Sequence, residues 1–170
     1  MPSSSQKLAA ILIWKLSSQL SSAKKVVTSR KSQPSSTFLA IQSPTTYLVG
    51  TGKKKRNGGQ WLLGKTFDTF CPLGPVVATD VDPSNLKISS WIGDDKMQDS
   101  NTKFLIFDIP FIINWVSQIC TLKAGDVILT GTPGGVGMHR NPPKFLADGD
   151  NCVIEIEGLG RLSNPVKMEE

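Results

Sequence analysis

All the acidic residues of this chain lie in its second part. Residues 1–67 contain eleven Lys and Arg residues and no Asp or Glu, so this part carries a charge of +11. Residues 68–170 contain eight basic residues and all fourteen acidic ones, so they carry −6, and the two parts together give the +5 of the whole chain. A charge split of this kind indicates two regions of different structural character.

The first region, residues 1–58, is basic and rich in Ser and Lys. Segments of this composition bury little apolar surface, and we predict that the region is poorly ordered. A basic, Ser-rich and acid-free N-terminus is also typical of an organellar transit peptide, although Arg30 is the only Arg before Arg56. A mitochondrial and a cytoplasmic location both stay open.

Two classes of partner are not expected. Aromatic residues that could stack on bases do not alternate with the basic residues, which argues against a nucleic-acid partner. No apolar run approaches the roughly 20 residues that span a bilayer, which argues against a membrane partner.

The second region, residues 59–170, has the spacing of strands and turns. Apolar runs separated by Gly, Pro and Asp predict strands at Pro75–Thr79, Leu86–Ile92, Lys96–Asp99, Val127–Leu129, Asn151–Glu157 and Arg161–Val166. Asp108 can cap a helix in which apolar residues recur at helical spacing, namely Ile109, Ile112, Ile113, Val116 and Ile119. The region is predicted to be mostly β with one or two short helices, and sheet packed on sheet is the expected architecture.

The cysteines form no pattern of a disulfide framework or a zinc site. Cys71, Cys120 and Cys152 are widely spaced, odd in number and contain no C-x-x-C pair. We predict that they are reduced, buried thiols.

The segment Gly59–Thr66 matches the phosphate-binding pattern G-x-x-x-x-G-K-[ST]. In a nucleotide site this pattern joins a buried strand to a helix, and its small loop lets backbone N–H groups face phosphate. Here the loop contains the bulky residues Trp61, Leu62 and Leu63, a charged stretch precedes it, and Pro72 follows soon after. A nucleotide site is therefore not expected.

Two segments of the second region are similar to motifs of one enzyme family. Gly64–Pro75, with the sequence GKTFDTFCPLGP, resembles the G-K-[ST]-F-D-T-x-x-P-x-G-P motif of the fumarylacetoacetate hydrolase superfamily. Asp126–Gly137, with the sequence DVILTGTPGGVG, resembles its G-D-[VI]-[IL]-x-T-G-T-P-x-G-V-G motif. The order agrees as well, and the most similar branch is the domain-containing 2 group. The resemblance covers about residues 56–167 and implies a partial mixed β-sandwich roll.

The resemblance also implies a site. Members of the family use Mg²⁺ or Ca²⁺ to bind a β-diketone or a 2-keto acid and to polarise it for C–C bond cleavage or decarboxylation. By this resemblance Lys65 would be the catalytic ammonium beside the developing oxyanion, where a positive donor contributes strongly. Thr69 would supply a hydroxyl near the metal-bound water. Gly131 and Thr132 would hold the carboxylate or keto oxygen of the substrate.

The metal ligands of the family are missing from this sequence. In the family they come from a Glu-x-Glu strand and from the Asp of a stretch resembling A-H-D-V-S-x-R-D-W-Q, all upstream of the Lys motif. A hard divalent cation needs several such oxygen ligands, and no Asp or Glu precedes Asp68 here. We therefore predict no metal ligands and no bound Mg²⁺ or Ca²⁺ in this chain.

Two other sets of polar residues could suggest a site. Glu155 and Glu157 have E-x-E spacing, which places both on one face of a strand, and we predict a solvated face rather than a metal site. His139 is the only histidine, and we predict a surface residue rather than a general base.

A shift of reading frame would explain the acid-free segment. If residues 14–53 are translated one base out of frame, Trp14 and Lys15 require a Glu codon, and the stretch to Lys24 permits EVELAVVIGK. In the same frame Pro44–Lys53 permits HDVSxRDWQ, and the spacing agrees with the family in both stretches. On this hypothesis the chain is a truncated or frameshifted, pseudogene-like family member.

Three functions are compatible with these features. The first is a degenerate family member without metal-dependent catalysis, whose incomplete roll exposes edges and apolar faces and is therefore poorly soluble. The second is a Mg²⁺- or Ca²⁺-dependent hydrolase or decarboxylase of 2-keto acids or β-diketones, with ligands that the sequence does not identify. The third is a non-catalytic partner that dimerises with itself or with intact relatives.

Overall fold

The computed structural model describes residues 62, 65–74, 77–78, 81–123 and 126–167, together with the backbone of four strands within residues 4–49. Those four are β1 (Ser4–Leu8), β2 (Leu12–Trp14), β3 (Ile41–Gln42) and β4 (Thr45–Val49). The later strands are β5 (Lys87–Ile92), β6 (Asp95–Asn101), β7 (Val127–Leu129), β8 (Asn151–Ile156) and β9 (Gly160–Pro165). The helical elements are α2 (Ile109–Ile119) and the single 3₁₀ turns η2 (Pro83–Asn85), η3 (Thr102–Phe104) and η4 (Gly137–His139).

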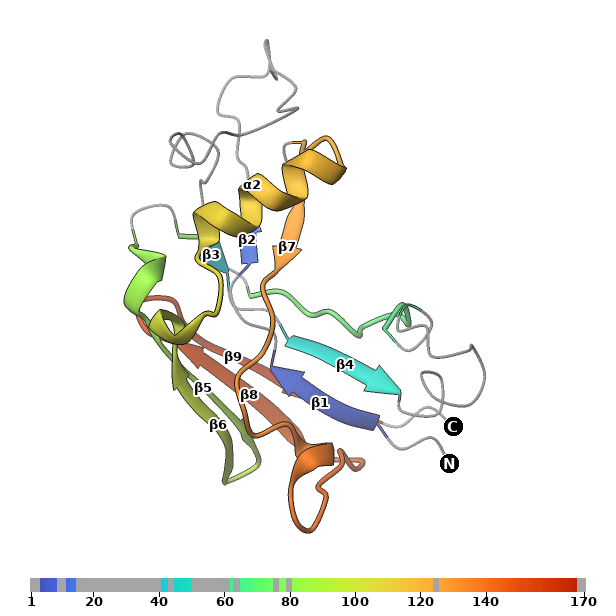
Figure 1. Cartoon of the computed structure of the whole chain (residues 1–170). Helices are drawn as coiled ribbons and strands as arrows, with labels where there is room; N and C mark the ends of the chain where they lie inside the picture. The colour runs from blue at the N-terminus through green and yellow to red at the C-terminus, as the bar shows by residue number, and fades with distance from the viewer. Residues whose placement is uncertain are drawn as a thin grey trace.

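The described strands form three sheets, all with antiparallel pairing. The largest has the order β6-β5-β8-β9, β7 joins β2 and β3 in a second sheet, and β1 pairs with β4 (Figure 1). The prediction of a mostly β fold with a short helix is confirmed, and five of the six predicted strands agree within two residues at each end. The predicted strand Pro75–Thr79 lies largely outside the described residues. Residues 1–58 also lie outside the described residues, apart from the backbone of β1 to β4. The poor order predicted for them therefore stays a prediction.

Helix α2 begins where the sequence predicts. The Asp108 carboxylate accepts a hydrogen bond from the backbone N–H of Phe111 at 2.8 Å, and Pro110 lies in the first turn, where no intrahelical N–H bond is lost. Ile109 and Ile113 are buried, whereas Ile119 is 66% exposed, so the apolar stripe ends before the helix does. Among the described residues, no helix is long and apolar enough to cross a membrane.

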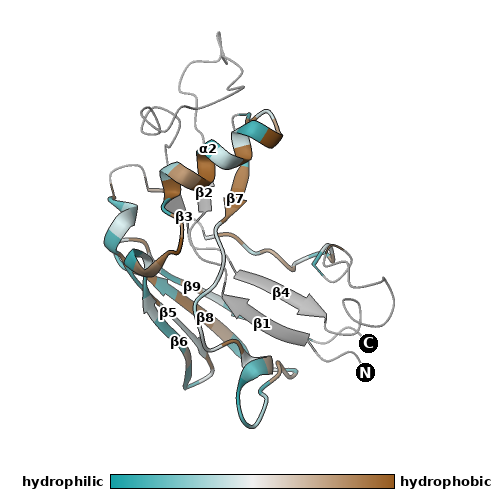
Figure 2. Ribbon diagram, viewed as in Figure 1, coloured by the Kyte–Doolittle hydropathy of each residue, from teal (hydrophilic) through white to brown (hydrophobic). Residues whose placement is uncertain are grey.

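The inner face of the large sheet carries two apolar clusters. We call the first the helix-side cluster, because α2 packs there on the start of β5 and the end of β8. Its buried members are Leu86, Ile88, Ile109, Ile113, Leu122 and Ile156. We call the second the hairpin-side cluster, since it lies near the β5–β6 turn; its buried members are Ile92, Met97, Leu146 and Cys152. Figure 2 shows the apolar residues of α2 and β7 above the sheet.

A polar pair separates the two clusters. Ser90 of β5 and Gln98 of β6 are paired across the strands and are 0% and 3% exposed. Burying polar groups is unfavourable unless they are hydrogen-bonded. The Ser90 hydroxyl donates to Gln98 Oε1 at 3.3 Å, and the rest of the Gln98 amide faces the loop that follows β7.

The cysteines differ in part from the prediction. All three are free thiols, and Cys152 is fully buried, as expected. Cys71 and Cys120 are exposed, so the prediction of burial was wrong for them. Cys71 lies in a surface turn and Cys120 caps the exposed end of α2, positions that no sequence spacing identifies.

Candidate functional site

The loop after β7 carries two of the predicted substrate-binding residues. Gly131 has a φ of +119°, a conformation that favours glycine, and it turns the chain out of the strand. Thr132 follows as an exposed residue. The Nε2 of Gln98 donates hydrogen bonds to Thr132 Oγ1 at 3.0 Å and to the Pro133 carbonyl at 2.8 Å. The loop is thus fixed to β6, and Thr132 is presented at the surface.

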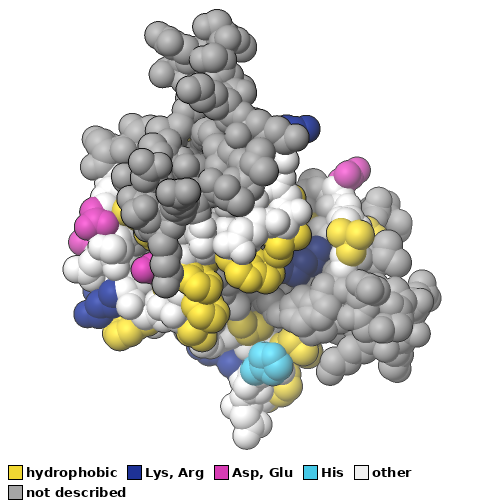
Figure 3. Space-filling view, turned by 45° about the horizontal axis from the view of Figure 1, so that its top comes forward, with side chains coloured by type: hydrophobic (Ala, Val, Ile, Leu, Met, Phe, Trp, Pro, Cys, Tyr) yellow, Lys and Arg dark blue, Asp and Glu magenta, His cyan; other side chains and the backbone are white. Residues whose placement is uncertain are grey.

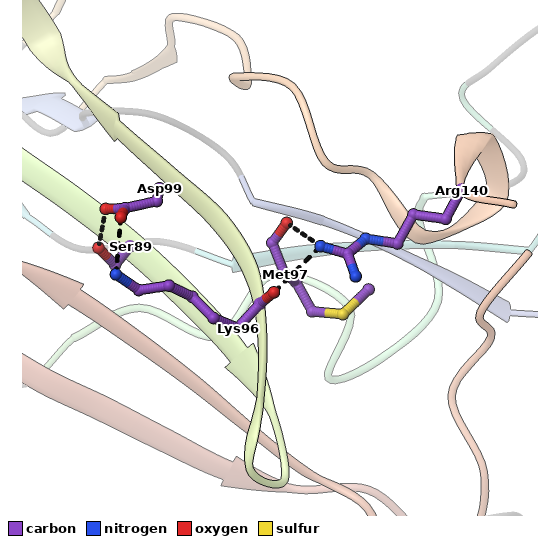
Figure 4. Close-up of polar contacts among 5 residues, drawn as sticks. All are labelled: Ser89, Lys96, Met97, Asp99 and Arg140. Atoms are coloured by element: carbon purple, nitrogen blue, oxygen red, sulfur yellow. Dashed lines mark hydrogen bonds and ion pairs between the residues drawn. The ribbon is translucent and has the colours of Figure 1, made fainter.

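A β-bulge in β6 brings the loop and the strand together. Ser90 pairs with Gln98 and Trp91 with Lys96, so Met97 is the extra residue between them. The bulge lies at Lys96 and Met97, whose carbonyls face the segment that follows the loop. Arg140, just beyond the loop, donates to both from Nη2 at 3.0 and 2.9 Å (Figure 4). A side chain from beyond the loop therefore bonds to the backbone at the bulge.

Ion pairs hold both ends of the bulged segment. Asp99 accepts hydrogen bonds from Lys96 Nζ at 2.7 Å and from the Ser89 hydroxyl at 2.9 Å (Figure 4). Both bonds lower the pKa of Asp99, and the bond from Lys96 has the larger effect. At the hairpin end, Lys144 pairs with Asp95, and this hydrogen bond is the main reason why the pKa of Asp95 is lowered. Both aspartates are exposed, so these are surface ion pairs and not buried charges.

The other two predicted site residues, Lys65 and Thr69, lie in a series of turns. The backbone N–H groups of Lys65 and Thr66 both bond to the Leu62 carbonyl, at 2.9 and 3.1 Å, and no helix follows within residues 65–74. The context that a phosphate-binding loop requires is therefore missing from these residues. Thr69 has a φ of +64°, which is unusual for a β-branched residue and often accompanies a functional constraint.

Lys65 lies close enough to Cys71 to affect its ionisation. The pKa of the Cys71 thiol is raised, first because partial removal of water disfavours the thiolate, while the Lys65 ammonium opposes the rise. Lys65 is half-buried in this turn. Its charge is thus held near the protein surface and not in a closed cavity.

The two motifs share one part of the core. Phe70 packs against the hairpin-side cluster, and the loop touches the same cluster where Gly135 lies against Met97. Figure 1 shows residues 65–74 running past β4, whereas the loop after β7 runs past β1. The structure therefore brings Gly131 and Thr132 together on one loop. It places Lys65 and Thr69 on a second segment, and the roles of all four stay predictions.

The described carboxylates do not fit a metal site. Most of them serve turns, helix caps or ion pairs: Asp82, Asp95, Asp99, Asp108, Asp126, Asp150, Glu155 and Glu157. Across the part of the chain that the structure describes, no three His, Cys, Asp or Glu residues are grouped as metal ligands would be. A hard divalent cation prefers several oxygen ligands around one point, and these residues do not supply them.

His139, Glu155 and Glu157 lie at the surface, as predicted. His139 is exposed in η4, and the histidine appears at the surface in Figure 3. Glu155 pairs with Arg161 at 2.8 Å across the outer face of the sheet. The Glu157 carboxylate accepts a hydrogen bond from the backbone N–H of Lys87 at 2.9 Å.

A surface hollow of about 580 Å³ lies beside the loop and is lined by Arg140, Asn141, Pro142, Pro143, Lys144 and Phe145. Its two cations are already engaged, Arg140 by the bulge carbonyls and Lys144 by Asp95. The Lys144 charge is therefore paired with a carboxylate, whereas the Arg140 guanidinium is held in place by neutral carbonyls.

Sequence reasoning identified the loop but missed the residues that hold it. Gln98 and Arg140 form the contacts between loop and sheet, yet each lies in a polar stretch where no spacing distinguishes it. Strand alternation does not identify Gln98 either. Without the bulge, Gln98 would pair with Ser89 and lie on the outer face of the hairpin, and the extra residue Met97 is what turns it to the buried face.

Comparison with known proteins points to one family. A family model described as the C-terminal part of fumarylacetoacetate (FAA) hydrolase matches residues 50–167. The oxaloacetate tautomerase Fahd2a, mitochondrial, of Rattus norvegicus is 56% identical over 114 residues, which cover 65% of this chain and 36% of that protein. A fumarylacetoacetate hydrolase domain-containing protein 2 homolog of Dictyostelium discoideum is 42% identical over 146 residues, covering 75% of this chain and 48% of that protein.

Solved structures agree with the sequence comparison. A fumarylacetoacetate hydrolase from psychrophilic Exiguobacterium antarcticum superposes with a TM-score of 0.86 at 30% identity, over 97% of this chain and 57% of that one. A maleylpyruvate hydrolase from Sphingobium sp. SYK-6, in complex with manganese(II) and pyruvate, gives a TM-score of 0.79 at 26% identity, over 99% and 56%. The chain spans about a third to a half of the length of the curated relatives that it matches.

Proposed function

Because the chain belongs to the fumarylacetoacetate hydrolase family, we propose that it is a degenerate member that keeps a substrate-binding loop and lacks metal-dependent catalysis. One observation carries the proposal: no Asp or Glu precedes Asp68, and most of the described carboxylates after it are engaged in turns, caps and ion pairs. The family's Mg²⁺ or Ca²⁺ would therefore lack its ligands here. When bound, such an ion would polarise the keto group of a substrate.

The ligand we propose is a small 2-keto acid. Relatives of this chain are named oxaloacetate tautomerases, and a structural neighbour was solved with pyruvate. Oxaloacetate and pyruvate share a carboxylate next to a keto group, and the exposed Thr132 hydroxyl on a rigid loop suits such an oxygen-rich anion. Binding without turnover is the expected behaviour. The relatives are also named as mitochondrial, which supports the mitochondrial alternative for this chain.

The origin of the loss is part of the proposal. The family match begins at residue 50, close to Lys53–Lys55, where a shifted reading frame would be restored. Sequencing the coding nucleic acid over residues 14–56 tests the frameshift. Codons for EVELAVVIGK and HDVSxRDWQ in the shifted frame are expected, and stop codons or unrelated residues there would refute it.

Calorimetry and a turnover assay test the loss of catalysis. Titration with Mg²⁺ and Mn²⁺ is expected to show no saturable binding. Oxaloacetate is expected to tautomerise and decarboxylate at the uncatalysed rate in the presence of the chain. Labelled pyruvate is still expected to bind in equilibrium dialysis. Saturable metal binding with turnover that Lys65→Ala abolishes would instead establish the metal-dependent hydrolase or decarboxylase. Lys123→Ala, which changes an exposed lysine outside both motifs, is the matched control.

A second candidate function is a non-catalytic partner of intact relatives. Large apolar side chains are exposed along η3 and α2: Phe104, Ile106, Phe107, Trp115 and Ile119 are 69%, 90%, 55%, 55% and 66% exposed. Apolar residues exposed in such number commonly mark interaction surfaces, and Figure 3 shows hydrophobic side chains gathered on the face that it presents. Co-purification of the tagged chain with an intact relative is expected, and no complex at micromolar concentration would refute this function.

A further inference from the structure

The orientation of the Gln98 amide is fixed by its neighbours. The Pro133 carbonyl oxygen can only accept a hydrogen bond, so the Gln98 atom that lies 2.8 Å from it must be the nitrogen. The opposite end of the amide, Oε1, accepts the hydroxyl proton of Ser90 at 3.3 Å. Both partners agree on one orientation, and the buried side chain cannot exchange these partners for water.

This orientation determines what the Thr132 hydroxyl can do. Gln98 Nε2 donates to Thr132 Oγ1 at 3.0 Å, so the oxygen of Thr132 is already an acceptor. A threonine hydroxyl has one proton to donate. Because Thr132 is exposed, that proton is accessible to water or to a ligand.

We propose that Gln98 is a positioning residue that makes Thr132 a hydrogen-bond donor for the carboxylate of a 2-keto acid. The inference rests on the proposed function and adds the ligand group and its polarity. A hydrogen bond from a hydroxyl to an ionised carboxylate is stronger than one to the neutral oxygen of a carboxamide. A hydroxyl that is fixed as a donor therefore favours the acid over its amide.

The series of donors runs in one direction from the core to the loop. Ser90 donates to Gln98, Gln98 donates to Thr132, and Thr132 donates to the ligand. Hydrogen bonds aligned in this way polarise and strengthen one another. The starting point is rigid, because Ser90 is fully buried in β5, an inner strand of the large sheet.

Selectivity between pyruvate and pyruvamide tests the role of Gln98. Equilibrium dialysis of the full chain is expected to show pyruvate bound more tightly than pyruvamide. Gln98→Glu replaces the donor by an acceptor, so the Thr132 proton turns toward Glu and the hydroxyl can only accept from a ligand, which suits an amide N–H and not a carboxylate. We expect about tenfold weaker pyruvate binding and a preference shifted toward pyruvamide.

A double-mutant cycle tests whether Gln98 acts through Thr132. Gln98→Met and Thr132→Val are each expected to weaken pyruvate binding about tenfold. The double variant is expected to bind pyruvate no more weakly than either single variant. Thr132→Ser keeps the hydroxyl and is expected to bind pyruvate as the unmodified chain does. Hydrogen exchange of the β5 and β6 peptides checks that each variant is folded. If Gln98→Met is not folded, Gln98→Glu takes its place in the cycle.

The results separate this inference from the proposed function. If the unmodified chain does not bind pyruvate, the proposed function fails and the inference with it. If it binds pyruvate but the two substitutions weaken binding additively, or Gln98→Glu leaves the preference for pyruvate unchanged, only the role of Gln98 is refuted.

Discussion

Gly135 lies so close to β6 that a methyl group on its α-carbon would overlap the carbonyl oxygen of Met97. The same methyl would come within 3.2 Å of Gln98 Cγ, and the φ of Gly135 is +101°. Met97 is the bulged residue, so the close approach depends on a glycine in the loop and on an irregularity in the strand. This contact sets the position of Thr132 three residues earlier.

Replacing Gly135 should therefore release the loop. Gly135→Ala introduces both the overlap and a strained φ, and we expect it to lower the free energy of unfolding by about 2 kcal/mol. Urea unfolding of dilute protein measures the loss, and hydrogen exchange of residues 131–146 should locate it. Gly134→Ala is the control, because a methyl there meets no atom within 4 Å, and its effect should stay within about 0.5 kcal/mol. Equal effects of the two substitutions would contradict the tight contact.

Arg140 is expected to stabilise the same junction through the bulge carbonyls. Arg140→Met removes the donor to Lys96 and Met97, and we expect a loss of about 1–2 kcal/mol together with faster hydrogen exchange at the β5–β6 hairpin. Arg161→Met removes the same charge from the outer face, where it breaks the exposed pair with Glu155 and a cation–π contact with the Trp91 ring. Because the Arg161 side chain is exposed, that control should cost no more than about 1 kcal/mol. A control as damaging as Arg140→Met would mean that charge, not the bulge contact, matters.

The exposed aspartates of β6 predict how stability changes with pH. The pKa values of Asp95 and Asp99 are lowered in the folded chain, by hydrogen bonds from Lys144 and Lys96 respectively. A lowered carboxyl pKa stabilises the fold above the ordinary aspartate value of about 3.9, and this contribution is lost as the pH falls through the lower, folded value. Urea midpoints should therefore decrease below about pH 4. The decrease should be smaller in Lys96→Met, and an unchanged pH dependence in that variant would refute the assignment.

Local signals account for the elements that the sequence predicts correctly. Asp108 and Pro110 define the start of α2 within one turn, and Gly93 at a φ of +57° marks the β5–β6 hairpin. Each signal acts between residues that are close in the chain, so its effect does not depend on the rest of the fold. The family motifs likewise locate the loop of Thr132 without any knowledge of its contacts.

The residues that complete the candidate site act over long separations. Gln98 bonds to a residue 34 positions later, and Arg140 reaches back 43 positions to Met97. Both contacts depend on a bulge whose extra residue has no sequence signature. Amphipathic spacing also failed to show that Ile119 is exposed, because burial depends on where the neighbouring sheet ends.

Exposed apolar residues near α2 should limit solubility. Ile106 is 90% exposed and follows Phe104 and precedes Phe107, both more than half exposed. Ile106→Lys should raise the soluble fraction and reduce light scattering, while the free energy of unfolding changes by less than about 0.5 kcal/mol. Ile113→Lys, which buries a charge at a position 1% exposed, should cost about 3 kcal/mol or more and increase aggregation. Unchanged scattering in Ile106→Lys would show that another surface causes association.

Thr69 should gain stability when its side chain is removed. Its φ of +64° disfavours a β-branched residue by about 1–3 kcal/mol, whereas glycine adopts this conformation freely. Glycine also makes the unfolded chain more flexible, at about 0.4–1 kcal/mol, so Thr69→Gly should raise the free energy of unfolding by about 1 kcal/mol. Thr66→Gly, in the same turn but without a positive φ, should lower it by the flexibility term alone. Urea unfolding measures both variants, and a loss at Thr69 equal to that at Thr66 would show that its conformation is not strained. If the Thr69 hydroxyl also binds the ligand, as the family resemblance implies, the more stable variant should bind pyruvate more weakly, which dialysis would detect.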